Sequence, residues 1–342
     1  MNNKRVFYID ALRVLSIFSV VVLHICAIDW YTAAVNTYHW QVLNFYDGLM
    51  RFCVPIFIII SGAFLLSSKK DYSLKDIFLK KILRVVTGFL FWSFVYLVFC
   101  KDFEIASEAD FVHKWLTGSR YHLWFPFTII CLYIISPILK EVCKSKKACE
   151  YFIILWFIFQ CVGMATGIFP SLNSTIATLK VYLTPQAVLG YSGYFVLGHY
   201  LSVYDITKKV RISSYILALL GVFVTIAGTG YMSLRYGSGY GLFYEYLMPN
   251  TVFVCIGVFL FFKYNVKGKA FTALVGVLSR LSFGIYFVHD LFIYILNHEL
   301  GVRTGFINPI VSVPLLSVVV FTLSTAVAFI IDKIPFVRKY II

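Results

Sequence analysis

Long apolar runs alternate with short polar segments along almost the whole chain. Each run has about the 20 residues that a helix needs to cross a hydrocarbon layer about 30 Å thick. The alternating segments of about ten residues that mark a transmembrane β-barrel do not occur in the sequence. The pattern therefore predicts an all-α, polytopic membrane protein with about ten transmembrane helices, near residues 8–28, 45–67, 80–100, 122–140, 150–168, 187–204, 212–231, 247–263, 271–296 and 308–331.

The composition supports lipid as the solvent of this chain. Its 342 residues are 60% hydrophobic and only 13% charged, with a mean hydropathy of +0.84. Soluble globular chains carry about 25% charged residues. No long polar linker interrupts the apolar runs, so we expect a single transmembrane domain over residues 1–342.

The lysines and arginines predict the orientation. With the N-terminus inside, 20 of the 30 fall on cytoplasmic segments and six on outer loops, which is a strong positive-inside bias. Both termini are then cytoplasmic. The net charge of +14 is mainly this topology signal, with contact to anionic membrane lipids as a further consequence. Nucleic-acid binding is disfavoured, because the cations are scattered over separate loops.

The eight cysteines suggest no metal or redox site. Cys143 and Cys149 fall on a predicted cytoplasmic loop, where disulfides are rare. No C-x-x-C sequence occurs, so a zinc or thioredoxin-type site has no sequence support, and we assign no metal.

Arg13 and His24 lie eleven positions apart on the first predicted span. Eleven residues are close to three helical turns and rise about 16 Å, so both side chains point to one face at different depths. Ionisable groups inside a bilayer are costly and usually functional. The pair therefore indicates a fixed cation near the inner leaflet and a titratable imidazole further out.

The other ionisable groups inside the spans sort by depth. Inner-side cations could bind a phosphate-bearing ligand from the cytoplasm, or simply snorkel to lipid phosphates. Outer-side imidazoles could handle a proton near a second ligand, or be structural. The inner group is Arg13, Arg84 and Arg280 with Lys80 and Lys81 just below; the outer group is His24, His122, His289 and Arg51, which Asp47 could pair with.

Five motifs together resemble one family. They are Arg13-x10-His24, the Pro-to-Ser-Gly segment 54–62, Tyr121-His122-Leu123-Trp124-Phe125, Tyr133-Ile134-Ile135-Ser136-Pro137, and segment 281–289 ending in Tyr286-x-x-His289. Over residues 8 to about 330 the chain resembles the acyltransferase-3 family of integral-membrane acyltransferases. Within that family it looks most like the enterobacterial common antigen O-acetyltransferase branch.

The resemblance implies a membrane O-acetyltransferase in the bacterial inner membrane. An acetyl group would pass from cytoplasmic acetyl-CoA to a hydroxyl of an extracytoplasmic glycan or lipid-linked sugar. In the family, the histidine that matches His24 is essential and the arginine that matches Arg13 accompanies it. A related membrane domain, fused to an amino-acid racemase, is linked to serine transport. A transporter of a small polar solute or a lipid-linked sugar is therefore the alternative.

The chemistry assigns expected roles. His24 is the candidate base, because acetyl transfer to a hydroxyl must remove its proton. Arg13 is too far from His24 to orient it, so binding the CoA phosphates or pantetheine is its better role, with Asp10 one turn below to hold the guanidinium. Asp29 and Asp290 are the candidates to orient His24.

The remaining candidate residues divide between donor and acceptor. Ser61, with Gly62, marks either the pantetheine path or a close helix contact at small residues. Trp124 and Tyr121 suit sugar stacking or an interfacial aromatic belt. The sequence is compatible with an oligomer. The full expected site is His24 as catalyst; Arg13, Arg84, Arg280, Lys80 and Ser61 for the donor; His122, Trp124, His289, Tyr286 and Arg51 for the acceptor; and Asp10 as support.

Overall fold

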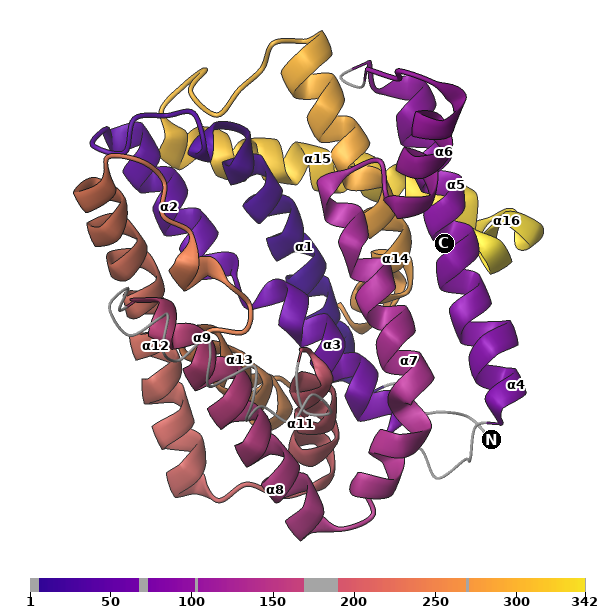
Figure 1. Ribbon diagram of the computed structural model, residues 1–342, viewed down its shortest axis with the longest axis vertical. Helices are drawn as coiled ribbons and strands as arrows, with labels where there is room; N and C mark the ends of the chain where they lie inside the picture. Colours follow the sequence, from indigo (N-terminus) through magenta and orange to yellow (C-terminus); the bar gives the residue numbers. More distant parts are fainter. Residues whose placement is uncertain (1–5, 68–72, 102–103, 169–189, 269–270, 342) are drawn as a thin grey trace.

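Helices account for all the regular secondary structure in the part of the chain that the computed structural model describes, residues 6–67, 73–101, 104–168, 190–268 and 271–341 (Figure 1). The α-helices are α1 Phe7–Trp30, α2 Tyr38–Met50, α3 Cys53–Leu65, α4 Leu74–Asp76, α5 Leu83–Phe99, α6 Glu108–Thr117, α7 Phe125–Val142, α8 Lys146–Trp156, α9 Gly163–Ala165, α11 Ser192–Val203, α12 Lys208–Tyr236, α13 Pro249–Asn265, α14 Thr272–Tyr294, α15 Pro309–Asp332 and α16 Pro335–Tyr340. Short π-helical turns are η1 Ile77–Ile82, η3 Phe157–Val162 and η7 Ile295–Glu299, and 3₁₀ turns are η2 Tyr121–Trp124, η4 Thr166–Ile168 and η6 Leu242–Tyr244.

Nine helical stretches within the described residues are long and apolar enough to cross a membrane, where α2 and α3 count as one stretch and adjoining π and 3₁₀ turns are included. They correspond to nine of the predicted spans, so the chain is an all-α, polytopic membrane protein. The remaining expected span, 187–204, starts among residues 169–189, which lie outside the described residues; its described part is the 12-residue α11. In Figure 1, α6 lies at the upper edge and the α7–α8 turn at the lower edge. We call the lower end cytoplasmic, as the lysine and arginine bias predicts.

The second predicted span is broken rather than continuous. Helix α2 ends at Met50 and α3 starts at Cys53. Pro55 has no N–H to bond the carbonyl of Arg51, and its ring crowds that carbonyl, so one straight helix cannot pass this point. The break leaves Arg51 beside Asp47, with Nη2 2.5 Å from Oδ2, so the pairing that the sequence suggested is present.

Helices α3 and α11 cross at very short range because each presents a glycine. A Cβ added to Gly62 would lie 2.0 Å from the carbonyl oxygen of Phe195, and a Cβ added to Gly198 would lie 2.0 Å from that of Ile59. Only glycine fits such a contact, which is how membrane helices pack without a hydrophobic driving force. The small-residue interpretation of Gly62 is therefore confirmed.

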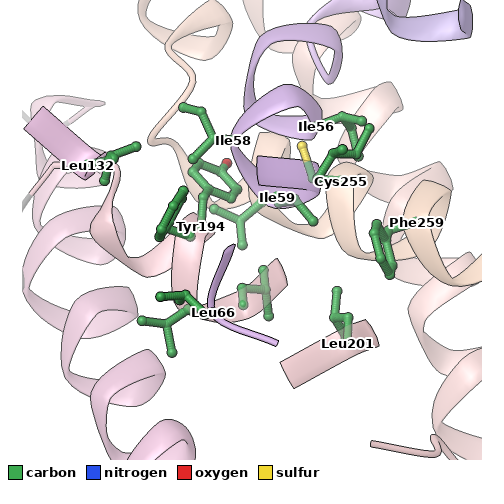
Figure 2. Close-up of a cluster of buried hydrophobic side chains, with 14 of the residues drawn as sticks. Ile56, Ile58, Ile59, Leu66, Leu132, Tyr194, Leu201, Cys255 and Phe259 are labelled. Atoms are coloured by element: carbon green, nitrogen blue, oxygen red, sulfur yellow. The ribbon is translucent and has the colours of Figure 1, made fainter. Parts of the chain in front are cut away.

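The packed core surrounds this crossing. Figure 2 shows its side chains from α3, α11 and α13, among them Ile59, Tyr194 and Phe259, which are fully buried. Helix α1 packs against α2, α3, α14 and α15, so it lies inside the bundle with neighbours on several sides. The continuous α1 carries both Arg13 and His24.

Candidate active site

Three histidines from distant parts of the chain meet in the outer half of the bundle. His24 comes from α1, His122 from η2 and His289 from α14. Their ring centroids are 5.1 Å apart for His24 and His289, 5.0 Å for His122 and His289, and 6.3 Å for His24 and His122. His122 and His289 are buried, and His24 is partly buried. We call this group the histidine cluster.

Several ring nitrogens of the histidine cluster have no hydrogen-bond partner among the described residues. Nδ1 of His289 lies 2.6 Å from the carbonyl oxygen of Tyr286 and must donate to it, which leaves Nε2 as the free acceptor. Among the described residues, that Nε2, Nδ1 of His24 and both ring nitrogens of His122 have no hydrogen-bond partner, although Nδ1 of His122 lies 3.8 Å from Asp290 Oδ2. Each such atom costs about 1–3 kcal/mol of desolvation, so this arrangement suits a polar ligand group rather than an inert core.

Asp290 lies next to the histidine cluster and binds two residues beside it. Its buried carboxylate accepts from Arg120 Nε at 2.6 Å and from the hydroxyl of Tyr121 at 2.8 Å. The ring of Tyr121 packs on that of His24, with centroids 4.9 Å apart. Among the described residues, Asp290 therefore acts on His24 through Tyr121, whereas direct orientation was the sequence expectation.

Asp29 was the other candidate to orient His24, and that expectation is wrong. Its carboxylate binds Arg303 Nε at 2.7 Å, the backbone N–H of Thr304 at 3.0 Å and the hydroxyl of Thr304 at 2.5 Å. Asp29 lies five residues beyond His24, which is not a whole number of turns, so it faces the outer loop before α15 instead.

A large cavity opens at the cytoplasmic end of the bundle. Its volume is about 1280 Å³, above the usual range of about 300–1,000 Å³ for small-molecule pockets. Five cations and one carboxylate line it, so its formal lining charge is +4. We call it the cationic cavity; the charged residues are Asp10, Arg13, Lys80, Lys81, Arg84 and Arg280.

A serine joins Arg13 to Asp10 in the wall of this cavity. Ser279 on α14 donates to Asp10 Oδ1 at 2.6 Å and accepts from Arg13 Nη1 at 3.4 Å. The guanidinium also lies 5.7 Å from the ring centre of Phe64. The sequence placed Asp10 near Arg13 but could not reveal the intervening hydroxyl, which comes from a helix about 270 residues away.

The other inner-side residues also line the cationic cavity. Arg280 keeps an ion pair with Asp332 at 3.1 Å, and Lys80 pairs with Asp76. Arg84 lies 5.9 Å from the ring centre of Phe283. Ser61 faces the cavity too, while its hydroxyl donates to the carbonyl of Phe57 at 2.8 Å.

A second cavity of about 840 Å³ lies beside the first. It shares Lys80, Arg84 and Arg280 with the cationic cavity and adds Arg338 and the carboxylate of Asp332. The three shared cations therefore stand between two openings, where an extended anionic ligand could contact them from either side.

Tyr286 connects the cationic cavity to the histidine cluster. Its side chain lines the cavity, and its hydroxyl donates to the carbonyl of His122 at 2.6 Å. Its ring lies 5.5 Å from that of His122 and 6.1 Å from that of His289. Phe125 packs on Tyr286 at 5.7 Å, and the two rings form an aromatic layer between the cavity and the histidines.

Trp124 and Arg51 lie away from the cationic cavity. Trp124 is 37% exposed, and its ring lies nearly parallel to those of Tyr191, at 5.7 Å, and Tyr246, at 6.0 Å. Arg51 is bound to Asp47 and lies 4.0 Å from the ring centre of Tyr244. Trp124 is therefore part of a group of three aromatic rings, and Arg51 forms a buried ion pair at the end of α2.

Sequence reasoning missed Arg120 and Ser279. Arg120 was counted among outer-loop cations, yet its side chain is only 10% exposed and bound to Asp290. The sequence offered one indication of the Arg120–Asp290 pair, which is that each residue adjoins a histidine motif. Arg120 directly precedes the Tyr121-His122 motif, and Asp290 directly follows His289. Ser279 gave no signal, because serines are common in apolar helices.

The described residues thus form a helical membrane bundle with a cationic cavity at one end and a histidine cluster beyond it. The acyltransferase-domain profile of the acyltransferase-3 family matches residues 6–332, so the chain belongs to that family and is a multi-pass membrane acyltransferase. The chain is similar to glucans biosynthesis protein C of Salmonella gallinarum, with 24% identity over 341 residues, covering 90% of this chain and 85% of that one. No solved structure matches it significantly.

Proposed function

We propose that this acyltransferase is an O-acetyltransferase of the bacterial inner membrane. It takes the acetyl group of cytoplasmic acetyl-CoA and transfers it to a hydroxyl of an extracytoplasmic glycan or lipid-linked sugar. One observation carries the proposal: Tyr286 lines the cationic cavity and also contacts two histidines of the cluster. Tyr286 therefore adjoins both the proposed donor site and the proposed acceptor site.

The cationic cavity supports a phosphate-bearing donor. CoA carries several phosphate charges at one end and an uncharged pantetheine arm at the other. A formal lining charge of +4 matches the first, and Arg13 and Arg84 would bind phosphate oxygens as forked donors. Ser61 and the aromatic layer at Tyr286 suit the pantetheine arm, which would extend most of the way along the rise of about 16 Å between Arg13 and His24.

His24 would act as the general base at the far end of that arm. In the transfer, the acceptor hydroxyl gives its proton to an imidazole nitrogen and its oxygen bonds to the thioester carbon. The carbon–sulfur bond then breaks, and CoA leaves as the thiol after taking a proton. His24 is suited to this because no hydrogen-bond partner among the described residues competes with substrate for its Nδ1.

The outer half would receive the acceptor. Trp124 is 37% exposed and adjoins Tyr191 and Tyr246, which together give the outer half the kind of aromatic surface on which sugar rings stack. The free nitrogens of His122 and His289 can bond sugar hydroxyls. The name of the Salmonella relative refers to glucan biosynthesis, which favours a glycan acceptor here. The common-antigen sugar that the motifs suggest and a glucan are the two acceptors to compare.

The reaction can be tested with purified protein in detergent. Wild-type protein should consume acetyl-CoA and release free CoA, faster when glycan acceptor is added, and His24→Ala should slow the release by at least about 10²-fold. Mass spectrometry of envelope glycans from a deletion strain should show the loss of one acetyl modification and so identify the acceptor. Acetyl-CoA that stays intact with every acceptor, together with solute uptake into proteoliposomes, would overturn the proposal in favour of the transporter alternative.

A further inference from the structure

Two cysteines and a histidine meet at the cytoplasmic end of the bundle, outside the site described above. Cys143 follows the last residue of α7, Cys149 lies in the first turns of α8, and His199 lies on α11. One ligand atom from each lies within 4.8 Å of the other two. All three are buried, with exposures of 6%, 0% and 6%.

The imidazole of His199 is already held in a metal-binding orientation. Its Nδ1 lies 3.0 Å from Ser67 Oγ, which lies 3.2 Å from Ser202 Oγ, and Ser202 donates to the carbonyl of His199 at 2.9 Å. Because that carbonyl can only accept, the chain of donors runs from Nδ1–H through Ser67 to Ser202. Nε2 is then the lone-pair nitrogen; among the described residues it has no hydrogen-bond partner of good geometry, and it lies near the backbone carbonyl of Cys143. Metal-ligating histidines show this division, with one nitrogen donating to a supporting group.

We propose that Cys143, Cys149 and His199 form a zinc site, with water at the fourth position. Two thiolates and one imidazole are a ligand set that Zn²⁺ accepts in tetrahedral geometry, with bonds of about 2.0–2.3 Å. The two thiolate charges neutralise the dication, which makes the complex compatible with a buried position. The three ligand atoms already lie within 4.8 Å of one another, so a small movement of the side chains would bring them within bonding distance of one ion.

The sequence could not reveal this site. Cys143 and Cys149 are separated by five residues rather than two, and His199 follows 50 residues later. The α7–α8 turn brings the two thiols together, and the packing of α8 on α11 adds the imidazole. The Cys149 thiol now contacts the carbonyl of Val142 at 3.7 Å and the thiol of Cys143, and thiol hydrogen bonds are weak, so a metal can replace both contacts.

The zinc site would join the α7–α8 turn to α11 and thereby fix one wall of the cationic cavity. Ser67 and Ser202 line that cavity and also complete the hydrogen-bond chain of His199. This role in the donor site rests on the proposed function, whereas zinc binding itself does not. Metal content therefore tests the site even if the acetyltransferase proposal fails.

The test measures metal directly on full-length protein in detergent, purified with a tag free of histidine and cysteine. After equilibration with Zn²⁺ and removal of excess, mass spectrometry should find about one zinc per chain in wild type. Cys143→Ser, Cys149→Ser and His199→Gln should each lower that content at least about tenfold. Cys131→Ser, an exposed cysteine on the same α7, is the matched control and should keep the zinc.

A second measurement does not depend on whether the variants fold. Co²⁺ added to wild-type protein should give the intense thiolate-to-cobalt absorption and the visible bands of a tetrahedral site, and Zn²⁺ should displace them. Ser67→Ala should keep these bands but weaken metal affinity by about 10–100-fold, because it removes the group that orients His199.

Three results would overturn the proposal. One is wild-type protein that holds no zinc after loading and shows no thiolate–cobalt absorption. Another is zinc content unchanged in folded Cys143→Ser and Cys149→Ser variants. The third is a disulfide between the two cysteines in protein isolated under reducing conditions, detected by alkylation and peptide mapping, which would make the pair a redox element instead.

Discussion

Replacing His24 with alanine separates catalysis from folding. The imidazole has ring contacts with Tyr121 at 4.9 Å and His289 at 5.1 Å, and its Nδ1 has no hydrogen-bond partner within the part of the chain that the structure describes. Aromatic contacts of this kind are worth about 0.5–1.5 kcal/mol each. We therefore expect His24→Ala to insert and fold, with a modest loss of thermal stability.

The catalytic effect of the same change should be much larger. Removing a general base lowers the rate by about 10²–10⁴-fold, which corresponds to about 2.7–5.4 kcal/mol at the transition state. The assay is CoA release from acetyl-CoA with acceptor present, measured on protein that elutes normally from size exclusion. His39→Ala is the matched control, because His39 is bound to Thr304 at 2.7 Å, outside the cluster. Turnover of folded His24→Ala within a few-fold of wild type would refute the base assignment.

Three further changes test donor, acceptor and fold. Arg13→Ala should weaken CoA binding by about 1–3 kcal/mol in calorimetry, whereas Arg235→Ala, an outer-end control, should leave it unchanged. If Arg13→Ala and wild type bound CoA with equal affinity, Arg13 would only reach out to lipid phosphates. Trp124→Ala should raise the KM for the acceptor and leave CoA affinity intact, and an unchanged acceptor KM would remove it from the site. Gly198→Leu should prevent accumulation of folded protein, because its Cβ would lie 2.0 Å from the carbonyl oxygen of Ile59; a stable, monodisperse variant would contradict the crossing geometry.

Features that depend on neighbouring residues were predictable from the sequence. Hydropathy over windows of about 20 residues located nine helices that the structure contains, and helical spacing placed Arg13 and His24 on one unbroken helix. The sequence did not predict that the second span consists of two helices. Pro55 signals the break and the spacing of Asp47 and Arg51 indicates their pairing, but neither gives the residues at which α2 ends and α3 starts.

Contacts between distant elements were the part that could not be predicted. Ser279 reaches Asp10 from a helix near the other end of the chain, and Asp290 binds Arg120 across 170 residues. Neither pair has a spacing rule, because membrane helices can pack in many orders that satisfy the same hydropathy. The wrong assignment of Asp29 has the same origin: it is near His24 in sequence, but the outer loop supplies its partners.

A structure determined with CoA bound tests the central claim most directly. The account predicts that the phosphates lie among Arg13, Arg84 and Arg280 in the cationic cavity, and that the arm passes Tyr286 so that the sulfur reaches His24. Such a complex would also show whether the aromatic layer of Phe125 and Tyr286 moves to admit the thioester. A nucleotide bound at the outer end, or a sulfur directed into lipid away from His24, would contradict the account.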